Sequence, residues 1–153
     1  MIFKINYTEN IENRTLIYRE EEHSFDMNPR NHSIDLELAF NKLTMSVVDD
    51  KVIQLSGFCG LTKEMYSNIE IPIYGKGFLI VEHELESGFI YDISNEEFPV
   101  QFNSQTGWVC IGNTNKKGKG VEFINNCVAF ISDRGEFLSL WLKPKNFPTD
   151  IKN

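Results

Sequence analysis

Residues 128–142 read VAFISDRGEFLSLWL and carry the clearest structural signal in this 153-residue chain. Two apolar runs, 128–131 and 136–142, lie on either side of the polar turn DRG at 133–135. Short runs of β-branched and aromatic residues around a glycine-bearing turn are typical of a β-hairpin. The stretch therefore predicts two antiparallel strands joined by a tight turn.

Residues 34–48, further toward the amino terminus, show a similar period-two pattern. Apolar and polar side chains alternate over 34–40, as in a half-buried strand, and the phase slips near residue 41. A helical stripe capped by Ser33 also fits these residues. We prefer two strands, because residues 44–48 favour β-structure and lead into a turn at Asp49-Asp50.

The whole chain predicts a single antiparallel all-β domain over residues 1–153. We expect roughly nine to eleven short strands, at the spacing of a sandwich or a barrel, and at most one short helix near 61–69. The first two strands, 2–7 and 16–20, are predicted to pair as an opening hairpin. The other strands are expected near these residues: 52–55, 77–86, 89–93, 100–102, 108–111 and 121–124. Strand order, and with it the choice between sandwich and barrel, stays open.

The charge of the chain is unevenly distributed. Fifteen basic and 22 acidic side chains give a net charge of −7. Residues 1–100 hold 8 basic and 18 acidic side chains, a net charge of −10, whereas residues 101–153 hold 7 and 4, a net charge of +3. An acidic surface repels nucleic-acid phosphates and attracts a basic partner, so we expect no nucleic-acid binding.

Apolar runs such as 78–81 are too short to span a bilayer, so no membrane association is expected. The amino terminus lacks the basic and apolar regions of a signal peptide, which predicts a cytoplasmic location.

Two acidic runs are the candidate contacts for a basic partner. Their six glutamates are Glu82, Glu84 and Glu86, and Glu20, Glu21 and Glu22. The first three would share one face of a strand, where carboxylates repel one another and attract a cation or a basic protein. The competing interpretation is that both runs are solvated charges that protect strands from aggregation.

The sequence offers few groups for catalysis. Its three histidines are scattered, and its cysteines have no metal-ligand spacing, so we expect no metal, no cofactor and reduced thiols. Cys59 lies between Gly57 and Gly60, which makes it a candidate reactive thiol on an exposed turn, although the glycines also suit a simple bend. A pair of carboxylates distant in sequence is the other enzymatic possibility.

Aromatic residues are abundant, with 12 phenylalanines, five tyrosines and two tryptophans. Trp141 alternates with leucines on its strand, so one face of that strand is expected to be partly exposed. A candidate interaction patch is formed by Phe89, Tyr91, Trp108 and Trp141. Large aromatic side chains are more commonly buried, and in a barrel they would line a ligand cavity.

The leading hypothesis is a non-catalytic binding protein whose acidic surface recognises a basic protein partner. Toxin-neutralising immunity proteins behave in this way, and the analogy rests on size, charge and the scarcity of catalytic groups. One alternative is a small-molecule-binding β-barrel with an aromatic-lined cavity. Another is an enzyme that uses Cys59 or a carboxylate pair. The sequence leaves the partner and the oligomeric state open.

Overall fold

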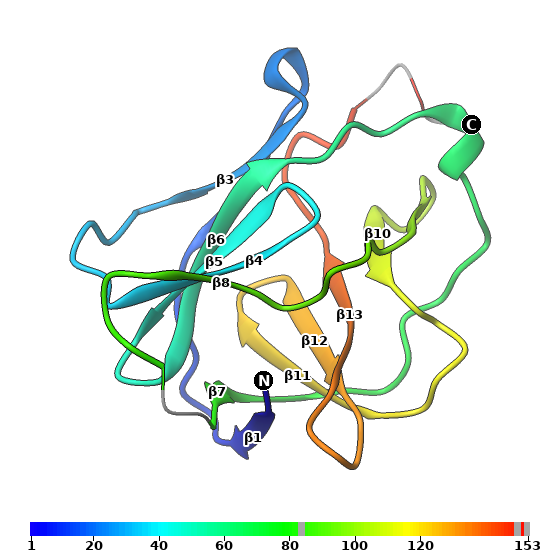
Figure 1. Ribbon diagram of the computed structural model, residues 1–153. Helices are drawn as coiled ribbons and strands as arrows, with labels where there is room; N and C mark the ends of the chain where they lie inside the picture. The colour runs from blue at the N-terminus through cyan, green and yellow to red at the C-terminus, as the bar shows by residue number, and fades with distance from the viewer. Residues whose placement is uncertain (83–84, 149–150, 152–153) are drawn as a thin grey trace.

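The computed structural model describes residues 1–82, 85–148 and 151, and nearly all of its regular structure is β-strand (Figure 1). The predicted all-β class is confirmed. The described residues form thirteen strands: β1 (Phe3–Tyr7), β2 (Thr15–Arg19), β3 (Ser24–Asn28), β4 (Leu36–Phe40), β5 (Leu43–Val48), β6 (Lys51–Phe58), β7 (Gly75–Val81), β8 (Ile90–Asp92), β9 (Val100–Asn103), β10 (Trp108–Gly112), β11 (Lys119–Ile124), β12 (Cys127–Ile131) and β13 (Phe137–Leu142).

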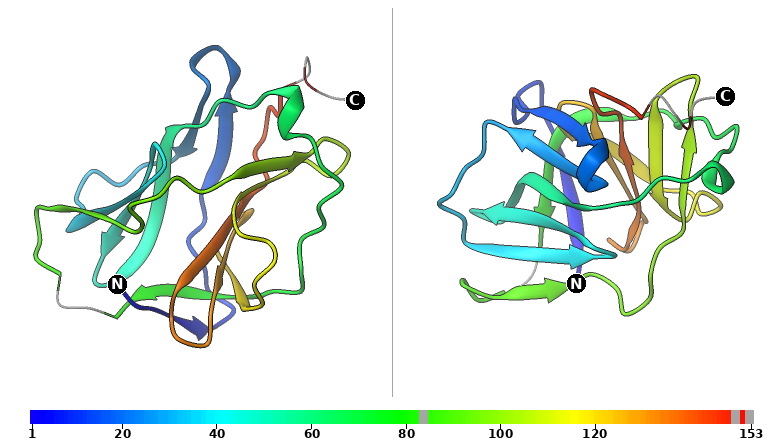
Figure 2. Two further views of the ribbon diagram at one scale, coloured as in Figure 1. Left: turned by 45° about the vertical axis from the view of Figure 1, so that its right-hand side comes forward. Right: turned by 90° about the horizontal axis from the view of Figure 1, so that it is seen from above.

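The strands belong to one sheet that curves around a shared core. Its main path runs β8-β4-β5-β6-β7-β11-β12-β13-β10-β9, with β1 paired to β7 and β3 joining β2 to β6. Two further views show β4–β6 and β10–β13 on opposite sides of the molecule (Figure 2). Across the described residues the sheet stays open, so the architecture is sandwich-like. No helix in the described part of the chain is long and apolar enough to cross a membrane.

Local turn chemistry produces the predicted hairpins. Strands β12 and β13 pair antiparallel with Val128 opposite Trp141, and Gly135 provides a φ of 82° in their turn. Residues 34–48 form the two strands β4 and β5, so the strand interpretation is confirmed. The φ angles of Asp49 and Asp50, 49° and 65°, suit a tight turn between β5 and β6.

The predicted opening hairpin is wrong. Strand β1 pairs with β7, and β2 pairs instead with β3, a strand that the sequence pattern did not indicate. The connection between β1 and β2 runs beside β11 instead, where Glu12 forms a parallel bridge with Ile124, and Arg14 helps to hold it there. Its amide donates to Asn125 Oδ1 at 3.0 Å and its Nε donates to the Ile53 carbonyl at 2.8 Å.

The described helical structure consists of two three-residue 3₁₀ turns. One, Lys63–Met65, lies inside the segment where a short helix was predicted. The other is Glu20–Glu22, which connects β2 to β3.

Two hydrophobic clusters stabilise the sheet. The larger lies between its two halves and includes Phe25, Leu38 and Phe102. The smaller lies on the outer side of β10, β12 and β13, where Ile69 and Ile71 from the irregular segment before β7 cover it. Its buried members are Trp108, Cys110, Val128, Phe130, Leu138 and Trp141.

Candidate functional site

Strand β8 lies at one end of the sheet and is the structural centre of the candidate site (Figure 1). It runs parallel to β4, with Ile90 beside Glu37 and Asp92 beside Ala39. The Glu37 amide donates to the Phe89 carbonyl at 3.1 Å, and the amide that follows β8, that of Ile93, donates to the Ala39 carbonyl at 2.8 Å. The inner edge of β8 is therefore bonded to the sheet.

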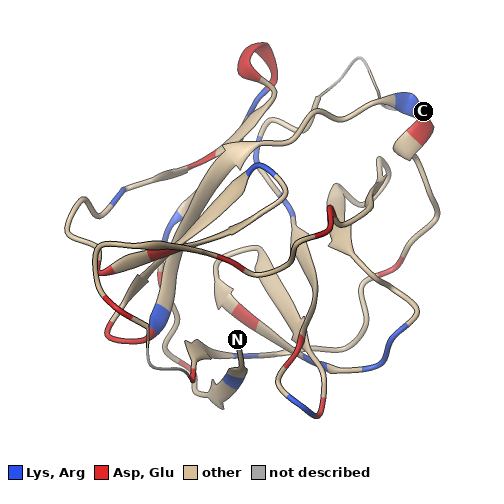
Figure 3. Ribbon diagram, viewed as in Figure 1, with Lys and Arg blue, Asp and Glu red and all other residues tan. Residues whose placement is uncertain are grey.

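Six carboxylates gather around this edge, and we call them the acidic face. They come from three stretches of the sequence, with two in each: Asp35 and Glu37, Asp49 and Asp50, and Glu86 and Asp92. Two hydrogen bonds hold those segments together. Gly88 donates its amide to the Asp35 carbonyl at 2.7 Å, and Asp49 donates its amide to the side-chain Oδ2 of Asp35 at 2.9 Å. Acidic segments follow this side of the sheet in Figure 3. All six residues are exposed except Glu37, which is half-buried.

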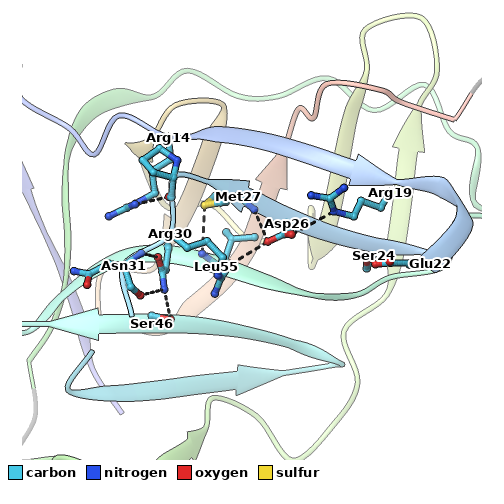
Figure 4. A network of polar contacts seen from close by, with 12 residues as sticks. Arg14, Arg19, Glu22, Ser24, Asp26, Met27, Arg30, Asn31, Ser46 and Leu55 are labelled. Atoms are coloured by element: carbon cyan, nitrogen blue, oxygen red, sulfur yellow. Dashed lines mark hydrogen bonds and ion pairs between the residues drawn. The ribbon is translucent and has the colours of Figure 1, made fainter. Parts of the chain in front are cut away.

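The arginines of the amino-terminal half are used elsewhere, in a polar network around β2 and β3 (Figure 4). The described residues contain three ion pairs: Arg14 with Glu12 at 3.3 Å, Arg19 with Asp26 at 3.3 Å, and Arg30 with Asp26 at 3.2 Å. Partial burial by itself raises the pKa of Asp26, but the Met27 amide and the two guanidinium groups outweigh it and lower that pKa.

The acidic face takes part in none of the ion pairs found among the described residues. Lys51 follows Asp49-Asp50 directly, and its Nζ lies over the Phe78 ring, 4.3 Å from the ring centroid. This lysine thus contacts an aromatic face, and the carboxylates keep a local excess of negative charge.

The structure places the six predicted glutamates in different regions. Glu86 belongs to the acidic face, and Glu82 lies just after β7, next to Val81, whose amide donates to the Asp50 carbonyl at 2.8 Å. Glu84 lies outside the described residues. Residues Glu20–Glu22 form the turn between β2 and β3, at the end of the molecule opposite to β7 (Figure 1). The two predicted acidic runs are therefore separate surfaces.

The predicted aromatic patch is wrong because both tryptophans are buried. Trp108 is 9% exposed and Trp141 is 2% exposed, and Trp141 Nε1 donates to Ser139 Oγ at 3.2 Å. The alternation argument assumed a solvated outer face on β13, but the segment with Ile69 and Ile71 covers that face. Phe89 is exposed beside the acidic face, next to the half-buried Tyr91.

The predicted exposed thiol is also wrong. Cys59 is buried, and burial together with the Glu97 charge raises its pKa to about 11. Burial raises the pKa of Cys110 to about 12 and that of Cys127 well above its usual range. These thiols are protonated at neutral pH, the opposite of what a cysteine nucleophile requires. The described residues contain no group of three or more histidine, cysteine or acidic side chains arranged to hold a metal ion.

Two of the cavities lined by described residues lie at the surface. The larger, of about 600 Å³, is lined by polar groups that include Glu96, Glu97 and Lys116. A groove of about 370 Å³ has Phe130 and Trp141 among its lining residues. The small-molecule-binding alternative requires a closed barrel, but the sheet formed by the described residues is open.

The sequence matches no protein-family model and no curated protein.

Proposed function

We propose that this chain is a non-catalytic binding protein whose acidic face recognises a basic polypeptide. One observation carries the proposal. Six carboxylates that take part in none of the ion pairs among the described residues gather at an end of the sheet with exposed apolar side chains. A surface of one charge attracts a partner of the opposite charge and accelerates its association.

The apolar residues at the edge favour a protein partner over a free cation. Phe89 and Ile90 are 55% and 64% exposed, and they lie between Glu86 and Asp92. A protein interface commonly combines an apolar centre with a polar rim, and this arrangement has both. A lysine- or arginine-rich segment with apolar side chains would satisfy the two parts together.

Neutralising the acidic face should slow association with a basic peptide. The test uses a synthetic peptide that alternates lysine and valine, and the triple variant Asp50→Asn, Glu86→Gln and Asp92→Asn. We expect its association rate to fall about 10-fold at low salt, because steering by complementary charge raises association rates by this order or more. The wild-type rate should itself fall steeply between about 0.02 and 0.3 M salt, as the screening length shortens. Stopped-flow fluorescence with a labelled peptide measures both effects.

The matched control removes the same charge from the other acidic run, by changing Glu20, Glu21 and Glu22 to glutamine. This variant should associate nearly as fast as the wild type. An equal loss in both triple variants, or a rate that ignores salt, would contradict recognition by the acidic face.

A further inference from the structure

Two other edges of the sheet are covered by neighbouring chain segments. Beside β9, Tyr66 forms a parallel bridge with Phe102, and the Ser67 amide donates to the Phe102 carbonyl at 2.8 Å. Beside β2, the Tyr18 amide donates to the Lys145 carbonyl at 3.0 Å, and the Lys145 amide donates to the Leu16 carbonyl at 2.9 Å. Both strands are thus protected from pairing with another chain.

Strand β8 has a different environment. Among the described residues it pairs with β4 alone. Because backbone groups alternate between the two sides of a strand, the bonds made by Phe89 and Ile93 toward β4 direct the amides and carbonyls of Ile90 and Asp92 away from the sheet. The outer edge of β8 presents a row of hydrogen-bonding groups to an incoming chain.

We propose that β8 is the docking edge for an extended segment of a basic polypeptide, which adds to the sheet as a further strand. This inference rests on the proposed function and specifies how the partner binds. In strand addition, backbone hydrogen bonds supply affinity, and alternate side chains supply specificity.

The side chains around β8 define the chemistry of the incoming strand. On the face of β8 that points toward the core, Tyr91 and Ile93 pack against the core residues. Apolar side chains of the partner would therefore extend this packed apolar face. On the opposite face of β8, which points away from the core, Glu37 and Asp92 lie beside the exposed Ile90. Lysine or arginine side chains of the partner are therefore favoured on this face. An extended segment that alternates basic and apolar residues meets both requirements.

The edge is already fixed in place by hydrogen bonds. The Glu86 amide donates to the Tyr91 hydroxyl oxygen at 2.9 Å. This bond holds the residues that precede β8 against the strand. The Gly88 amide is bonded to the Asp35 carbonyl. Binding therefore requires little ordering of this side of the interface, and preorganisation of this kind favours affinity.

The test compares three peptides by isothermal titration calorimetry against the whole chain. The first alternates lysine and valine, the second is the same peptide with its backbone amides N-methylated, and the third is a neutral peptide that alternates threonine and valine. N-methylation keeps the charge and removes the backbone donors, so we expect it to weaken binding about 10-fold or more, since several hydrogen bonds are lost together.

A substitution at Ile90 addresses the same bonds from the protein side. Ile90→Pro removes one outward amide while the bonds toward β4 remain, so it should weaken binding of the first peptide, but by less than N-methylation does. The matched control Ile73→Pro places the same proline at an exposed residue outside the acidic face, and it should bind as the wild type does. The methylated peptide needs no protein variant, so the conclusion does not depend on how the proline variant folds.

The outcomes separate this inference from the proposed function. Equal affinity for the methylated and unmethylated peptides would overturn strand addition and leave recognition by charge in place. Equal affinity for the neutral and basic peptides, with methylation still harmful, would overturn recognition by charge and support strand addition. Binding of none of the peptides at low salt would overturn both.

Discussion

Replacing Phe102 by alanine is expected to lower the free energy of unfolding by about 3–5 kcal/mol, the usual cost of truncating a buried phenylalanine. Phe102 is fully buried in β9, with ring centroids 6.0 Å from Tyr66 and 5.6 Å from Phe147. Its removal leaves a cavity and loosens both segments that pack on this strand. Urea denaturation followed by tryptophan fluorescence measures the change.

Phe89→Ala is the matched control for that substitution. The same atoms are removed, but from a residue that is 55% exposed beside the acidic face. We therefore expect the free energy of unfolding to change by no more than about 0.5 kcal/mol. Similar losses in the two variants would contradict the assignment of Phe102 to the core.

Gly112→Ala is expected to destabilise the protein by about 3 kcal/mol or more, because backbone strain and steric overlap add together. Gly112 ends β10 with a φ of 141°, opposite Ser139 on β13. A Cβ atom there would lie 2.4 Å from the Leu138 carbonyl oxygen and 2.5 Å from Ser139 Cα. These are backbone atoms, so the β10–β13 pairing must shift to make room. Thermal unfolding monitored by circular dichroism reports the loss.

Gly60→Ala provides the control for the glycine substitution. A Cβ at Gly60 would meet no heavy atom within 4 Å among the described residues. We expect the unfolding free energy of this variant to stay within about 1 kcal/mol of the wild-type value. A Gly112→Ala protein as stable as the Gly60→Ala protein would contradict the close β10–β13 approach.

Local features of the fold were predictable from the sequence because turn residues and alternation act over a few positions. Asp49-Asp50 and the DRG turn at 133–135 each predicted a hairpin that the structure contains. Pairing between distant strands leaves no such local pattern. The β1–β7 pair and the parallel β4–β8 pair depend on how the whole chain packs, so the opening hairpin was predicted incorrectly and the position of β8 was not predicted.

The candidate site was predictable only in part for the same reason. Glu86 was found because it belongs to a run of glutamates in the sequence. Asp35, Asp49 and Asp92 were missed because the fold, and not the sequence, brings them together. The tryptophans were misplaced because the covering residues Ile69 and Ile71 lie in an irregular segment with no periodic pattern.

Backbone amide NMR of the isotope-labelled protein, titrated with the alternating lysine and valine peptide, tests recognition by the acidic face most directly. We expect the largest chemical-shift changes in residues 35–39 and 86–93, with the amides of Ile90 and Asp92 also gaining protection from hydrogen exchange. Shifts centred on Glu20–Glu22, or changes spread evenly over the surface, would contradict it.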